Sequence, residues 1–386
     1  MKKAALSFVA LTAISLIATS TAARADITIG ATLSLTGPGS SLGIPEKQTL
    51  EILPATLAGQ KLKVVILDDR SDPTQAVVNA RKMISEDKVD VMFGGSLTPT
   101  SLAILDVVGP AETPVISLSG SGSIIIPQEG NKRWAFKLAP NEPFMAARIF
   151  GHAVDNHIGT VAYISHATAF GESFTEEMEK VAQLRKVKSL AWERFNPTDT
   201  SVTPQVLKAL ATNPDSVLIG ASGTSAAAPV IELRRRGFRK QIYLNQGVAN
   251  NDFLRVGGAD LEGAVFPVSP VLVAAQLSDA NPIKKVALEY LRQFEGKYGA
   301  GTLSLFGATA WDAYLITAAA TPAALKAGSP GTAAFRRALK DAIEQTHNFV
   351  ATQAVFSMSP TDHNGTDQRG QVLVRIENGH WKLIAE

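Results

Sequence analysis

Residues 63–93 read KVVILDDRSDPTQAVVNARKMISEDKVDVMF, and this stretch contains one complete strand, helix and strand. Residues 63–68 and 89–93 are short runs rich in β-branched side chains, which predict strands. The segment between them carries apolar residues at helical spacing, namely Ala76, Val77, Ala80, Met83 and Ile84. A helix that joins two consecutive strands implies a parallel pair with a right-handed crossover.

The same alternation runs along most of the chain. Residues 27–34 and 114–118 predict two more strands of this first block, and Thr98 followed by Pro99 predicts a helix N-cap. After Pro140 the pattern starts again, with strands predicted at 160–165, 190–195, 216–219, 241–244 and 263–268. Helices are predicted at 172–186 and 226–236, the latter ended by Gly237, and over most of 282–345. Residues 371–384 predict a hairpin that turns at Asn378-Gly379.

Two repeated blocks predict an α/β protein of two doubly wound, Rossmann-like lobes. About 360 residues also exceed what one hydrophobic core supports. We predict a first lobe from residues 26–139 and 269–355 and a second lobe from residues 140–268 and 356–386. A three-stranded hinge would join them, with crossings at 138–143, 266–270 and 357–361, each of which carries a proline.

The N-terminal residues have the three zones of a secretory signal peptide. Lys2 and Lys3 are followed by an apolar run over residues 4–18 and by the small-residue ending Ala23-Arg24-Ala25. The run is shorter than the roughly 18 to 20 residues that a spanning helix needs. We therefore expect residues 1–25 to be removed by cleavage after Ala25, and the mature chain to be exported to the periplasm.

Charge and cysteine content exclude some functions. Removal of Lys2, Lys3 and Arg24 lowers the number of basic residues from 37 by three. The 35 acidic residues of the mature chain then outnumber the basic ones by one. Such a balance gives no basic surface for nucleic acid. The chain has no cysteine, so neither disulfides nor a lipid anchor on cysteine is expected.

Motifs of catalysis and metal binding are absent from the sequence. There is no G-x-S-x-G elbow, Walker A loop, H-E-x-x-H or G-x-G-x-x-G after a strand. Six histidines are scattered without metal-ligand spacing. We therefore predict no enzyme activity, no metal and no cofactor.

Small polar residues cluster after two strands of the first lobe. Residues 94–99 read GGSLTP and residues 119–123 read SGSGS. Backbone N–H groups, serine hydroxyls and a helix N-terminus can hold a carboxylate without a lysine. His166 follows the strand at 160–165, at the edge where open α/β sheets bind ligands, so it is either a solvated loop residue or a ligand contact.

Over nearly the whole mature chain, the sequence resembles the leucine/isoleucine/valine-binding protein family of periplasmic receptors, in several segments that occur in the same order. The likeness is carried by ITIGATLSLTGPGSSLG at 27–43, by residues 63–84, by the glycine loop at 94–95 with TPVIS at 113–117, and by AFGESF at 169–174 and LRRRGF…LNQG at 233–247. The resemblance implies a monomer of two lobes that close on a small ligand and deliver it to the membrane permease of an ABC transporter. A ligand sensor of the same fold is the alternative role.

The resemblance also implies a ligand site between the lobes. It would contain Leu42, Phe170 and Phe306 as apolar or aromatic contacts. His166 is added to the candidates because of its strand-end position. The remaining candidates come from strand-end loops: Ser96, Leu97, Ser119, Gly120, Ser121, Ser222, Thr224 and Gln246.

Gln246 is a departure that bears on the ligand. Amino-acid-binding members of the family carry a carboxylate at the matching position, where it pairs with the ligand's ammonium group. An ammonium group buried against an amide would lack a compensating charge. Leu42 and Phe170 also stand where larger or hydroxylated aromatic residues are usual. We therefore favour an aromatic or phenylpropanoid carboxylate without an α-amino group; a branched-chain amino acid or an amide is the alternative.

Overall fold

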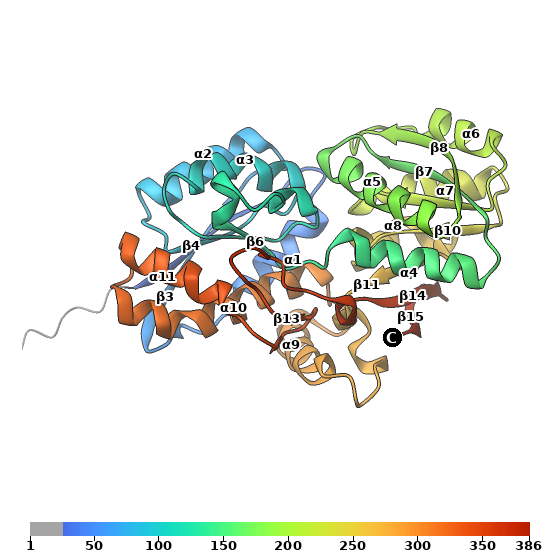
Figure 1. Cartoon of the computed structure of the whole chain (residues 1–386). Coiled ribbons are helices and arrows are strands. Elements are labelled where there is room, and N and C mark those ends of the chain that lie inside the picture. The colour runs from blue at the N-terminus through green and yellow to red at the C-terminus, as the bar shows by residue number, and fades with distance from the viewer. Residues whose placement is uncertain (1–25) are drawn as a thin grey trace, which may run out of the picture.

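The computed structural model describes residues 26–386. The proposed signal peptide, residues 1–25, lies outside the described residues. Figure 1 shows two α/β lobes side by side, joined by several chain segments. No helix within residues 26–386 is long and apolar enough to cross a membrane.

The first lobe is built on a six-stranded sheet in the order β2-β3-β1-β4-β5-β6. Pairing is parallel except between β2 and β3. Helices α2 and α3 cover one face, and α10 and α11 lie on the other (Figure 1). The strands are β1 (Ile27–Leu33), β2 (Thr56–Leu57), β3 (Gln60–Asp68), β4 (Val91–Gly94), β5 (Val115–Ser117) and β6 (Ala135–Lys137). The helices are α1 (Ser40–Leu50), α2 (Pro73–Ser85), α3 (Thr98–Val108), α9 (Ile283–Tyr298), α10 (Leu305–Ala327) and α11 (Ala333–Glu344).

The second lobe is built on a seven-stranded sheet in the order β15-β14-β11-β10-β9-β7-β8. Its strands are β7 (Thr160–His166), β8 (Lys188–Phe195), β9 (Ser216–Gly220), β10 (Gln241–Tyr243), β11 (Val265–Val268), β14 (Val372–Glu377) and β15 (His380–Ala385). Its helices are α4 (Glu142–Asp155), α5 (Ala169–Leu184), α6 (Thr203–Ala211), α7 (Ala227–Arg235) and α8 (Asn251–Gly257). The two-residue strands β12 (Phe349–Val350) and β13 (Val355–Phe356) pair separately.

Side-chain alternation explains why helices cover both faces of the second sheet. Val161 and Tyr163 of β7 pack in one core with residues of α4 and α5, whereas Ala162 and Ile164 pack in another with residues of α6 and α7. Successive residues of a strand point to opposite faces. All four side chains are fully buried. An interior strand of a sheet that is covered on both faces, such as β7, must therefore be apolar along nearly its whole length.

Most predicted elements are confirmed, including the doubly wound lobes and the hairpin at Asn378-Gly379. Two details were wrong. Leu97, not Thr98, stands at the N-cap of α3, and no side chain caps this helix. The proposed third crossing at 357–361 instead lies against the first lobe, as does the rest of the segment up to residue 366.

The contacts of His363 and Asn364 explain the second correction. The backbone N–H of Lys137 in β6 donates to the carbonyl of His363 at 3.0 Å, and Asn364 Nδ2 donates to the carbonyl of Lys137 at 2.7 Å. The chain reaches the second sheet only at β14. Residues 356–366, predicted in the second lobe, are therefore bonded to the first.

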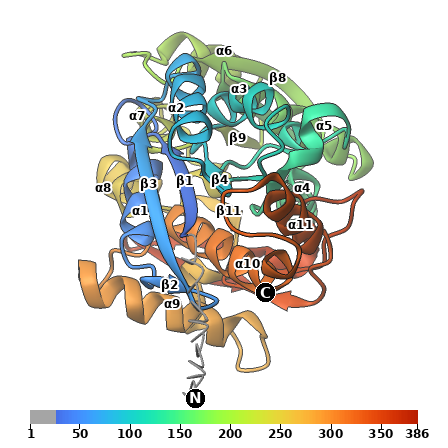
Figure 2. The same cartoon turned by 90° about the vertical axis from the view of Figure 1, so that its left-hand side faces the viewer.

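Helix α1 passes unusually close to the loop after β1, and it packs against α10 (Figure 2). A Cβ atom on Gly43 would lie 2.3 Å from the carbonyl oxygen of Ser34. Only a residue without Cβ fits there, and this approach positions Leu42 and Glu46 of the same helix.

Gly43→Ala should therefore destabilise the protein by about 1–3 kcal/mol, the usual cost of overpacking a core. Gly296→Ala, the same change inside α9, is the matched control, because nothing lies within 4 Å of its Cβ position. The control should leave stability unchanged or raise it by up to about 1 kcal/mol. Urea unfolding measures both, and equal stability of the two variants would contradict the close packing of α1.

Candidate functional site

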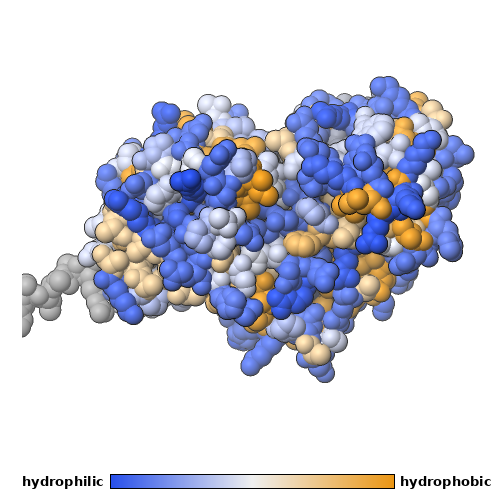
Figure 3. Space-filling view, viewed as in Figure 1, coloured by the Kyte–Doolittle hydropathy of each residue, from blue (hydrophilic) through white to orange (hydrophobic). Residues whose placement is uncertain are grey.

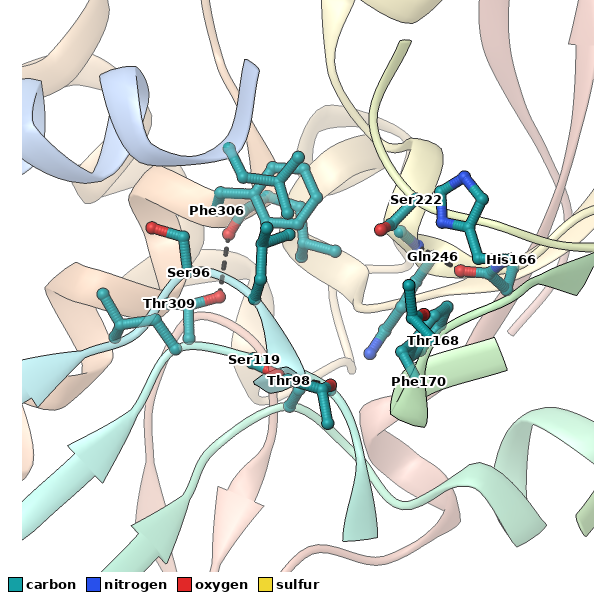
Figure 4. A pocket seen from close by; sticks show the side chains of 18 of the residues that line it. Ser96, Thr98, Ser119, His166, Thr168, Phe170, Ser222, Gln246, Phe306 and Thr309 are labelled. Carbon is teal, nitrogen blue, oxygen red and sulfur yellow. Dashed lines mark hydrogen bonds between the residues drawn. The ribbon is translucent and has the colours of Figure 1, made fainter. Parts of the chain in front are cut away.

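The candidate site is a cleft between the two lobes (Figure 4). The empty space between its walls is about 820 Å³ when the open mouth is included. In the space-filling view of Figure 3, a furrow separates the two lobes on a mostly hydrophilic surface.

The lobes touch each other around this cleft. Gly223 of the second lobe has a positive φ of 69°, and a Cβ atom there would lie 3.2 Å from Leu42 of the first lobe. A Cβ atom on Gly120 of the first lobe would lie 3.7 Å from the Phe170 ring of the second. The lobes therefore approach each other closely enough here for both to contact one ligand.

Ten of the twelve candidate residues lie around this cleft: Leu42, Ser96, Leu97, Ser119, Gly120, His166, Phe170, Ser222, Gln246 and Phe306. Figure 4 shows those from the first lobe facing those from the second. That they contact a ligand stays a prediction.

Ser121 and Thr224 were wrongly placed in the lining. Ser121 is fully buried and its hydroxyl accepts a hydrogen bond from the backbone of Ser123, so it stabilises a 3-10 turn instead. Thr224 begins another 3-10 turn, two residues after Ser222 in the sequence.

The first lobe supplies neutral hydrogen-bonding groups. Ser96 comes from the loop between β4 and α3, Thr98 is the first residue of α3, and Ser119 follows β5. The Thr98 and Ser119 hydroxyls are hydrogen-bonded at 2.8 Å. Because no side chain caps α3, the N-terminus of this helix offers backbone N–H groups and a positive dipole end to the cleft.

His166 is buried rather than solvated, with 3% of its surface exposed. Its Nε2 is hydrogen-bonded to the Ser225 hydroxyl at 3.0 Å, and its ring packs edge-on against Phe195. Burial lowers the pKa of His166 to about 4, so the imidazole is neutral at neutral pH. It can offer a hydrogen bond to a ligand, but no charge.

Gln246 lies at the second-lobe side of the cleft, 6% exposed. Its Oε1 accepts hydrogen bonds from Gln371 Nε2 at 3.2 Å and from the Ser269 hydroxyl at 3.5 Å. Ser269 follows β11 and Gln371 precedes β14, so both stand on segments that connect the lobes. The amide is thus held by the hinge region.

The lining of the cleft carries no aspartate, glutamate, lysine or arginine. Glu172 and Asp252, two carboxylates of the second lobe, do not line it. They are half exposed and pair with Arg194 and Arg255 instead. Within residues 26–386 no group of three or more histidine, cysteine and acidic residues is arranged to hold a metal ion.

Thirteen lining residues were not among the candidates: Pro38, Thr98, Pro99, Leu118, Ala139, Met145, Thr168, Pro197, Asn245, Gly247, Leu305, Thr309 and Gln353. Several adjoin candidates in the strand-end loops and could have been found from that position. Thr309 and Gln353 could not, because they lie on α10 and on the loop before β13. Gln353 Nε2 donates to the Thr309 hydroxyl at 3.0 Å.

Comparison with known proteins identifies relatives of this architecture. A family model described as periplasmic binding protein matches residues 26–379. The Leu/Ile/Val-binding protein homolog 3 of Brucella melitensis is 22% identical over 279 residues, which cover 70% of this chain and 73% of that protein.

Two solved structures extend the comparison. An extracellular ligand-binding receptor from Rhodopseudomonas palustris HaA2 is 37% identical with a TM-score of 0.91, over 94% of this chain and 100% of that one. The branched-chain amino acid transporter substrate binding protein LivJ of Streptococcus pneumoniae, solved with isoleucine, is 18% identical with a TM-score of 0.78, over 94% and 100%. This second likeness shows a shared fold.

Proposed function

Because this chain belongs to the periplasmic binding protein family, we propose that it is the substrate-binding component of an ABC uptake transporter, and that its ligand is a carboxylate without an α-ammonium group. An aromatic or phenylpropanoid acid is the favoured class. The protein binds this ligand in the cleft without a chemical step and passes it, as an exported monomer, to a membrane permease.

The absence of formal charge from the cleft lining carries the ligand proposal. An α-amino acid would bring an ammonium group into a site where no carboxylate side chain stands to compensate it. Burial of such an unpaired charge costs several kcal/mol. A ligand carboxylate, in contrast, finds hydroxyls and the N-terminus of α3, which stabilise an anion without a cation.

The other residues that line the cleft favour a ligand with an aromatic ring or a long apolar chain. Leu42, Leu97 and Leu305 lie on the first-lobe side together with Phe306, and Phe170 and Met145 lie on the other. Aromatic rings and a thioether pack well against a flat apolar ligand.

Branched-chain amino acids are the second candidate, because relatives are named Leu/Ile/Val-binding proteins and LivJ was solved with isoleucine. An ammonium group would then have to be held by neutral acceptors alone. The two candidates differ in one chemical group, which makes them separable.

Matched ligand pairs test the proposal. Thermal unfolding of residues 26–386 would be recorded with 3-phenylpropanoate against phenylalanine, and with 4-methylpentanoate against leucine. Each pair differs only in the α-ammonium group. A ligand at about 100 times its Kd adds about 2.7 kcal/mol, which raises Tm by a few degrees.

We expect a rise in Tm with 3-phenylpropanoate and none with phenylalanine. A rise with leucine but not with 4-methylpentanoate would show that the site accepts an ammonium group, and would overturn the ligand class while keeping the receptor. 3-Phenylpropanamide tests the carboxylate itself: equal binding of the amide and the acid would mean that no anion is recognised.

A further inference from the structure

Glu46, behind the first-lobe wall of the cleft, is a buried carboxyl group that the proposed function does not use. It lies on α1 with 0% of its surface exposed and forms no ion pair with any residue from 26 to 386. Its Oε1 is buried without a hydrogen-bond partner. Its Oε2 is hydrogen-bonded to the hydroxyl of Ser96, which lines the cleft.

The neighbours of Glu46 make its ionised form unfavourable. Asp69, also fully buried, follows β3 and has one oxygen without a partner; Asp68 and Asp72 flank it. On α10, which packs against α1, Asp312 is bonded to backbone N–H groups of Thr352 and Gln353. Lys47 of α1 pairs at the surface with Glu51. Among residues 26–386, therefore, no cation pairs with Glu46 to compensate a charge on it.

The pKa of Glu46 is displaced in the direction that this geometry requires. Burial raises the pKa well above its usual value, the hydrogen bond with Ser96 offsets part of that rise, and the charge of Asp69 adds to it. Burial of this kind favours the neutral form of a carboxyl group over its ionised form.

The protonation state of Glu46 determines what Ser96 offers to a ligand. The backbone N–H of Ser34 donates to Ser96 Oγ at 3.0 Å, so this oxygen already accepts one hydrogen bond. When Glu46 is ionised, the Ser96 hydroxyl must donate to it. When Glu46 is neutral, its O–H can donate to Ser96 Oγ, and the Ser96 proton is free to donate into the cleft.

We infer that Glu46 is a positioning residue that couples ligand binding to proton uptake: in its neutral form it orients the Ser96 hydroxyl as a donor toward the ligand's carboxylate. A proton taken from solvent ends on Glu46, and no covalent bond changes. The inference rests on the proposed function, since it requires a carboxylate beside Ser96. It holds for 3-phenylpropanoate and for leucine alike, because both carry that group.

Isothermal calorimetry with 3-phenylpropanoate tests the inference between about pH 5 and about pH 9. Ligand binding favours neutral Glu46, so affinity is highest below the pKa of Glu46 in the free protein and falls as pH rises through it, approaching about tenfold per pH unit for one proton. Buffers of different ionisation enthalpy should report net proton uptake above that pKa.

Glu46→Gln is the decisive variant, because its amide N–H donates to Ser96 at every pH. We expect its affinity to lose the pH dependence, so that above the pKa of Glu46 its advantage over the wild type in binding the probe grows by up to about tenfold per pH unit. Glu51→Gln, on the same helix but at the surface, is the matched control and should keep the wild-type slope. Ser96→Ala should remove both the dependence of affinity on pH and the tighter binding that the wild type shows at low pH.

The outcomes separate this inference from the proposed function. Binding of either probe without proton uptake, or an equal slope in the wild type and Glu46→Gln, overturns the role of Glu46 and leaves the receptor intact. If neither probe binds, the proposed ligands fail. Glu46 is then tested without ligand, by the infrared C=O band of a neutral carboxylic acid in the wild type minus Glu46→Gln, recorded from about pH 5 to about pH 9, the range of the calorimetry. Absence of that band would overturn the inference.

Discussion

Gln246→Glu should weaken the binding of 3-phenylpropanoate by about a hundredfold, or about 3 kcal/mol. The new carboxylate would keep the donors Gln371 and Ser269, but no basic side chain lines the cleft to compensate its charge. It would also stand in the same cavity as the ligand's own carboxylate, and like charges in a water-poor site repel strongly.

The same variant should gain affinity for phenylalanine, because the ammonium group now finds a partner. Gln345→Glu is the control for the substitution itself, since Gln345 is exposed at the end of α11. Calorimetry with 3-phenylpropanoate and with phenylalanine measures the loss of affinity for the first ligand and the gain for the second. Undiminished binding of 3-phenylpropanoate by Gln246→Glu would mean that the ligand does not approach this residue.

Gly120→Leu should abolish closure and weaken binding of 3-phenylpropanoate by about a hundredfold. Gly120 faces the Phe170 ring across the cleft, and a Cβ atom on Gly120 would already lie 3.7 Å from that ring. A leucine side chain would hold the lobes apart, and ligand contacts from both lobes stabilise the closed form only if they form together. Gly120→Ala is the control, because a single Cβ makes an ordinary contact there.

Small-angle scattering and calorimetry together check the prediction for Gly120→Leu. With saturating 3-phenylpropanoate the wild type and Gly120→Ala should have a smaller radius of gyration than Gly120→Leu, whose radius should not change with ligand. Thermal unfolding should show all three proteins folded, because Gly120 lies at the cleft and outside the three cores. A compact, ligand-bound Gly120→Leu would contradict closure across this contact.

Local pattern was sufficient for much of the architecture. Residues 63–93 form β3, α2 and β4 as predicted, because strand and helix periods are properties of neighbouring residues. The loops that hold Ser96 and Ser119 could be placed together in advance, since parallel strands bring their carboxyl ends to one edge of the sheet.

Features that depend on contacts between distant segments could not be predicted in this way. Residues 357–361 carry a proline-bearing pattern typical of a crossing, yet the hydrogen bonds that the next residues, His363 and Asn364, form with β6 keep this part of the chain on the first lobe. His166 had two open interpretations, and only the packing of Phe195 and Ser225 around it excludes the solvated one.

By itself, then, the sequence determined two doubly wound lobes, the strand-end position of the polar loops and the missing charge at Gln246. Only the tertiary structure decided that Thr309 and Gln353 line the cleft, that Ser121 and Thr224 do not, and that Glu46 stands buried behind Ser96. The physical reason is that periodicity specifies which face of an element is covered, whereas the partner that covers it is chosen by the packing of the whole chain.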